Sequence, residues 1–121
     1  MSFVLYFTTG GHAMVRKFVE IKKILKDYKA ELRKHGVRVT KMLLYGSYAR
    51  DNPKPYSDID VVVISPDLAK YTLLKRQEFL AVRTIPINAP LEVIGYTPKE
   101  FRASKGKIFG QILTKTAVSF N

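Results

Sequence analysis

The segment that most constrains the fold is Asp58–Ile64, in which two aspartates open a run of valine and isoleucine. Residues that branch at Cβ favour extended strands. A short apolar run of this kind, preceded by a loop rich in proline, predicts a strand that is buried on at least one face. The chain must therefore supply other elements to cover it.

Helical and extended patterns alternate around this strand. Apolar residues that recur every three or four positions predict a helix over 15–35, which ends at Gly36. Further patterns predict strands at 37–45 and 91–96, a helix from Ser65 to about Val82, a short helix from the capping box Thr97–Glu100, and a helix over about 108–118. Residues 1–7 suggest a short strand and residues 8–11 a turn. This order predicts a layered α/β-type domain on a small sheet.

The length of 121 residues predicts a single domain over 1–121, with 1–13 as an N-terminal extension and 37–100 as the core that bears the motifs. The absence of cysteine excludes disulfides, thiolate nucleophiles and cysteine-bound zinc. The longest apolar runs are too short to span a bilayer, and no basic segment precedes residues 1–7. We therefore expect a soluble, cytoplasmic protein.

The net charge of +11 is concentrated in two parts of the chain. Residues 14–41 carry ten basic and three acidic side chains, and residues 99–121 carry five basic and one acidic. Such a surface favours anionic partners, including nucleic acid or an acidic protein. Charge alone favours the simpler interpretation, in which the lysine-rich face of the first helix is a solvated surface.

Three carboxylates are candidates for metal ligands and catalysis. Asp58 and Asp60 are two residues apart in the predicted strand, so their side chains share one face. Mg²⁺ would relieve the repulsion between them and accept substrate phosphates as further ligands. Transfer at phosphorus works well with two ions about 4 Å apart, which needs a third carboxylate. Glu92, the single acid of the third strand, is the best candidate. A strand-entry cap for the aspartates and an edge-strand ion pair for Glu92 are the alternatives.

Gly46, Ser47 and Arg50 are candidates for binding a triphosphate. Glycine at a strand end permits a sharp turn and a close approach of the backbone to a ligand. Ser47 adds a hydroxyl and an N–H group, and a helical turn starting there would favour an anion. Arg50 would add a fixed cation, although a solvated loop charge is an equal alternative.

These residues form the pattern GS-x10-D-x-D with a later strand carboxylate, within YGSYARDNPKPYSDIDVVV. This pattern resembles the nucleotidyltransferase superfamily of DNA polymerase β type. The chain is most similar to its small stand-alone members, the minimal nucleotidyltransferases, which are often antitoxin partners of HEPN-domain toxins. Residues 37–100 carry the resemblance. It implies an α+β fold with a small mixed sheet flanked by helices, and Mg²⁺-dependent transfer of a nucleoside monophosphate, AMP from ATP, to a hydroxyl group.

The resemblance also implies roles for individual residues. Gly46 and Ser47 match the phosphate-binding turn, Asp58 and Asp60 the metal pair, and Glu92 the third carboxylate, as ligand or as base. In some members the acceptor is a tyrosine of the partner toxin. Asp51 stands where the family usually has glycine, and Glu92 is one methylene longer than the usual aspartate.

Three functions follow as hypotheses. The first is an Mg²⁺-dependent nucleotidyltransferase that modifies a partner or a small acceptor, in a homo- or hetero-oligomer. The second is an antitoxin that neutralises a HEPN toxin by contact and keeps a weak nucleotide site. The third, which rests on charge alone, is a nucleic-acid-binding protein, and the sequence lacks the arginine and aromatic platform that it would need.

Overall fold

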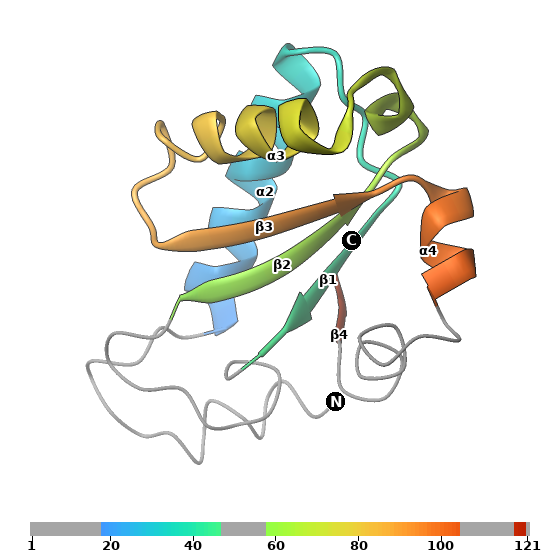
Figure 1. The fold of residues 1–121 in the computed structure, drawn as a ribbon. Helices are drawn as coiled ribbons and strands as arrows, with labels where there is room; N and C mark the ends of the chain where they lie inside the picture. The colour runs from blue at the N-terminus through green and yellow to red at the C-terminus, as the bar shows by residue number, and fades with distance from the viewer. Residues whose placement is uncertain (1–17, 47–57, 105–117, 121) are drawn as a thin grey trace.

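A computed structural model describes residues 18–46, 58–104 and 118–120 of the chain. Its elements are α2 (Phe18–Lys34), β1 (Lys41–Tyr45), β2 (Ile59–Ile64), the 3₁₀ helix η1 (Pro66–Lys70), α3 (Leu73–Val82), β3 (Leu91–Tyr96), α4 (Pro98–Ser104) and β4 (Val118–Phe120). The four strands form one sheet in the order β3-β2-β1-β4 (Figure 1). Strands β2 and β3 are parallel, whereas β1 is antiparallel to both β2 and β4. The sheet is therefore mixed, as expected, and the fold is α+β.

The sheet separates two apolar clusters. The larger lies on the face covered by α2, η1 and α3, and joins Ile21, Leu25, Tyr28 and Leu32 of α2 to alternate residues of the strands. The smaller lies on the other face, where Leu43, Val62 and Ile64 pack with Tyr96 and Phe101. Strand β2 contributes to both clusters, which explains why its sequence is almost continuously apolar.

Helix α2 forms because apolar residues recur along one side, and four of them, Ile21, Leu25, Tyr28 and Leu32, are fully or nearly fully buried. On one flank it is joined to α3, since the Tyr28 hydroxyl donates a hydrogen bond of 2.7 Å to the carbonyl of Leu80. The helix ends as predicted near Gly36, whose φ of +88° is open to glycine and rare for other residues. No helix of the described ranges has the length and apolar character needed to cross a membrane.

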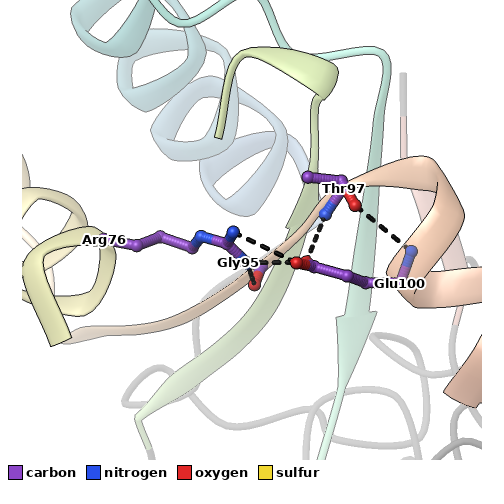
Figure 2. Close-up of polar contacts among 4 residues, drawn as sticks. All are labelled: Arg76, Gly95, Thr97 and Glu100. Carbon is purple, nitrogen blue, oxygen red and sulfur yellow. Dashed lines mark hydrogen bonds and ion pairs between the residues drawn. The ribbon is translucent and has the colours of Figure 1, made fainter. Parts of the chain in front are cut away.

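Helix α3 also protects the free edge of the sheet. Strand β3 is an edge strand, and its outward carbonyls would otherwise be open to another chain. The Gln77 amide donates to the carbonyl of Val93 at 2.5 Å, and Arg76 donates to that of Gly95 at 3.3 Å. Figure 2 shows that the same arginine also reaches Glu100 at the start of α4.

Several predicted elements have different bounds. The first strand begins at Lys41 rather than residue 37, and the second begins at Ile59, one residue after Asp58. The helix predicted from Ser65 to about Val82 is wrong as a single element, because the chain is extended at Tyr71 and Thr72. A second helix starts there because Thr72 Oγ1 accepts a hydrogen bond from the N–H of Lys75 at 3.2 Å.

The C-terminal prediction is wrong where it can be compared. Val118, placed at the end of a helix, lies in strand β4 and pairs with Leu44. The rest of that predicted helix, and the strand and turn predicted in residues 1–11, lie outside the described residues.

Candidate active site

Three polar side chains form a row across one end of the sheet. Asp60 of β2 is the register partner of Tyr45 in β1 and of Glu92 in β3. Side chains at paired positions of neighbouring strands point to the same face. The row therefore lies on the face opposite α2 and α3. Glu92 is exposed and Asp60 is half-buried, so the two carboxylates lie side by side at a surface that solvent reaches.

We expected Glu92 to lie beside the aspartates if the third strand paired with the second. Strands β2 and β3 do pair, and their register places Glu92 beside Asp60. Asp58 is placed differently. It is exposed and precedes the strand, so the alternation of a strand does not fix its side chain beside that of Asp60. Across residues 18–46 and 58–104, no three Asp, Glu, His or Cys side chains gather closely enough to hold a metal ion. The structure thus brings together one pair, Asp60 and Glu92.

Gly46 ends β1 directly beside this pair. Its φ of +75° lies in the region that favours glycine. A Cβ atom added to it would collide with Asp60 Oδ2 and would lie 2.9 Å from Asp60 Cγ. The turn at position 46 therefore favours glycine, as the sequence predicts. Among the described residues, the Asp60 carboxylate is the group that lies against the backbone of Gly46. Ser47 and Arg50, the other predicted phosphate contacts, lie outside the described residues, as does Asp51.

Tyr45 is a member of the row that the sequence analysis did not single out. Burial is the main cause that raises the pKa of its hydroxyl to about 12, and the charges of Asp60 and Glu92 contribute to the same rise. The hydroxyl therefore stays protonated at neutral pH and can act there as a hydrogen-bond donor. Its position immediately before Gly46 was the available signal, but only the strand register shows that it faces Asp60.

A shallow hollow of about 310 Å³ adjoins the row at the edge of β3. Tyr45, Glu92 and Ile94 line it from the sheet, and Gln77, Ala81 and Thr84 line it from the α3 region. The acidic row is therefore open to a ligand at the end of the sheet. The grouping of adjacent carboxylates, a glycine turn and a protonated tyrosine suits a ligand that carries a metal-bound phosphate.

The comparisons with known proteins point to one family. Residues 20–109 match the family described as "Nucleotidyltransferase domain", which covers well over half of the chain and includes α2 through α4. A curated relative from Methanocaldococcus jannaschii, described as "Putative protein adenylyltransferase", is 44% identical over 55 residues. That match covers 43% of this chain and 63% of the relative.

A solved structure from Sulfolobus solfataricus, described as a "putative nucleotidyltransferase", shares the fold. It superposes with a TM-score of 0.59 over 84% of this chain and 80% of that chain, at 18% sequence identity. This likeness confirms the α+β fold, and the family match confirms the resemblance to nucleotidyltransferases. The chain belongs to the nucleotidyltransferase domain family, in line with the minimal members that its motif resembles.

Proposed function

We propose that the protein transfers AMP from ATP, with Mg²⁺, to a hydroxyl group of a partner protein. The observation that carries the proposal is the register pairing of Asp60 with Glu92, beside the backbone of Gly46. The family match supports the reaction class. The description of the Methanocaldococcus relative as a protein adenylyltransferase supports AMP and a protein acceptor.

The residues present fit Mg²⁺ that is shared with the substrate. Both groups of the pair are carboxylates, and Mg²⁺ is commonly bound by one or two carboxylates together with water and phosphate oxygens. The described residues offer a pair and no closed set of protein ligands, which suits such a partly open site. Asp60 and Glu92 would hold the ion, with Asp58 as the further ligand that the motif implies. Two ions are expected, and Mg²⁺ bound there would neutralise charge on the phosphates.

The protein's own groups have separate tasks in this reaction. The acceptor hydroxyl oxygen forms a bond to the α-phosphorus of ATP, and the bond from that phosphorus to the bridging oxygen of pyrophosphate breaks. The proton of the hydroxyl passes to a carboxylate, Glu92 or Asp60, and pyrophosphate leaves. Gly46 and Ser47 would hold the triphosphate, with Arg50 beside them. Catalysis of this kind depends mainly on positioning and on the neutralisation of charge.

The partner that the motif implies is a HEPN-domain protein, with one of its tyrosines as the acceptor. Within the described residues, the hollow beside Glu92 is small and open, which leaves room for an acceptor that another protein presents. The functional form would then be a hetero-oligomer.

The proposal is tested by incubating the protein with α-³²P-labelled ATP and Mg²⁺, with and without the product of the neighbouring gene as the candidate partner. Label should appear on the partner, and Asp60→Asn should abolish transfer while the circular dichroism spectrum stays unchanged. Glu78→Gln is the matched control, because Glu78 is an exposed acid of α3 away from the row. Tight binding of the partner by both forms, with no transfer by either, would instead favour an antitoxin that acts by contact and keeps a vestigial nucleotide site.

A further inference from the structure

Helix α2 carries a straight line of four cations. Lys22, Lys26, Lys29 and Arg33 are spaced by four, three and four residues, and all four are exposed. Residues at these spacings stack along one side of a helix, here over about 16 Å at 1.5 Å per residue. Like charges at such spacings destabilise a helix. Local helix stability therefore does not explain the line, which we call the basic stripe.

Two of the three acids of α2, Asp27 and Glu31, pair with cations outside the basic stripe. Asp27 pairs with Lys23 at 2.8 Å. Glu31 lies 3.9 Å from Lys34 and 4.0 Å from Arg83, on the flank that faces α3. Within the described ranges, no side-chain hydrogen bond or ion pair involves any member of the stripe. Its four positive charges are thus directed to solvent without a neutralising group from this part of the chain.

A hollow of about 460 Å³ runs along the basic stripe. The four cations line it together with Leu25, Ala30 and Met42. Leu25 and Met42 belong to the core on the helix-covered side of the sheet, opposite the row of Asp60 and Glu92. The long aliphatic stems of lysine add apolar surface to the walls. The hollow therefore combines an apolar floor with a cationic rim, and it is separate from the candidate active site.

Few acidic residues of the chain are available to cover the basic stripe. Of its ten acidic residues, nine lie in the described ranges, and Asp51 is the single one elsewhere in the sequence. Residues 1–17 and 105–117 contain no aspartate or glutamate. An acidic surface complementary to the stripe would therefore have to come largely from another molecule.

We propose that the basic stripe and its hollow dock an acidic amphipathic helix of a partner protein. A partner helix with carboxylates every three or four residues places them at the same spacing as the cations of the basic stripe. Several ion pairs then form together. An apolar side chain between those carboxylates would enter the hollow above Leu25 and Met42. Nucleic acid fits less well, because the described residues that line the hollow include no aromatic ring to stack on bases and three of the four cations are lysines. The proposal does not depend on the transfer reaction.

The probe is a fluorescent synthetic helix of about 20 residues with glutamates at the spacing of the stripe and leucines between them. A scrambled peptide of the same composition and a single-stranded RNA of similar length are compared. The variant Lys26→Glu with Lys29→Glu should weaken binding of the helical peptide by about tenfold or more. The matched control, Lys75→Glu with Lys99→Glu, makes the same change of charge on α3 and α4 and should stay within about twofold of the natural protein.

Asp60→Asn should bind the peptide as the natural protein does, so failure of transfer and failure of docking are distinguishable. If the double glutamate variant does not fold by circular dichroism, Lys26→Gln with Lys29→Gln removes the charges without reversing them, and the same loss of binding is expected. Equal loss in the stripe and control variants would overturn the proposal, as would equal binding of the scrambled peptide. Binding of RNA in preference to the peptide would assign the surface to nucleic acid instead.

Discussion

The backbone of Gly46 lies directly against the carboxylate of Asp60. A side chain at position 46 would collide with Asp60 Oδ2, and the φ of +75° adds strain for any residue with a Cβ atom. Glycine at this turn therefore serves the candidate site as well as the strand end. The collision with Asp60 and the backbone strain can be tested separately. Gly36 has a similar φ of +88° but does not contact the acidic row.

Gly46→Ala should lower the free energy of unfolding by about 1–2 kcal/mol and should reduce adenylyl transfer by about a hundredfold. Gly36→Ala should show a similar loss of stability with nearly full transfer, because its Cβ would meet only the flexible end of Lys70, at 3.1 Å. Urea unfolding and the labelled-ATP assay measure the two quantities. Equal transfer by the two variants would show that the Gly46–Asp60 contact has no part in the reaction.

The pairing of Asp60 with Glu92 predicts opposite effects with and without Mg²⁺. Like charges on directly paired residues destabilise a sheet, so Glu92→Gln should raise the free energy of unfolding by about 0.5 kcal/mol when divalent ions are absent. Mg²⁺ at about ten times its dissociation constant should stabilise the natural protein by about 1.4 kcal/mol. The stabilisation of Glu92→Gln by the same Mg²⁺ should be much smaller.

Thermal unfolding with and without MgCl₂ measures this difference, and Glu78→Gln serves as the control for loss of an exposed acid. The same Mg²⁺ response in Glu92→Gln and the natural protein would remove Glu92 from the metal site. This readout needs no acceptor and no ATP, so it tests the pair even if the partner protein is unknown.

The sequence suggested which residues could form the candidate site, but not how they are arranged. The alternation of aspartate and apolar residues identified the strand at Asp60, and the single acid in LEVIGY identified Glu92. That these two are register partners depends on the crossover from β2 to parallel β3, which a local pattern does not encode. The same limit applies to Tyr45. Its place beside Asp60 depends on the antiparallel register of β1 and β2, which the local sequence does not encode.

The elements that were mispredicted are short and depend on tertiary contacts. Strand β4 has three residues, and its pairing with Leu43 and its neighbours in β1 defines it more than its own pattern does. The break between η1 and α3 had a local signal in Thr72, a good N-cap residue. A prediction of one long helix followed because the apolar spacing continues on both sides of that threonine.

Thr72→Ala should therefore cost about 1 kcal/mol of stability, since it removes the hydroxyl that accepts from the N–H of Lys75. Thr84→Ala is the control, because the Thr84 hydroxyl donates to the carbonyl of Ala81 near the other end of the helix and caps no N–H group there. Urea midpoints of the two variants test this. A loss from Thr84→Ala that equals or exceeds that of Thr72→Ala would contradict the capping role.

The ion pair of Arg76 with Glu100 predicts how stability responds to acid. The Arg76 side chain is only 4% exposed, and its two terminal nitrogens lie 2.6 and 3.2 Å from the Glu100 oxygens (Figure 2). Glu100 also accepts from the N–H of Thr97 at 2.8 Å. The hydrogen bonds from Arg76 are the main cause that lowers the pKa of Glu100 below its ordinary 4.5.

A lowered pKa in the folded state means that the pair stabilises the protein fully above about pH 4.5 and loses this effect as the pH falls through the lowered value. At pH 7, Glu100→Gln should cost about 1–2 kcal/mol, because Arg76 loses its charged partner. The difference between the natural protein and this variant should shrink steadily below pH 4.5. Urea unfolding from neutral to acid pH measures it, and a difference that stays constant would show that the Glu100 charge does not stabilise the fold.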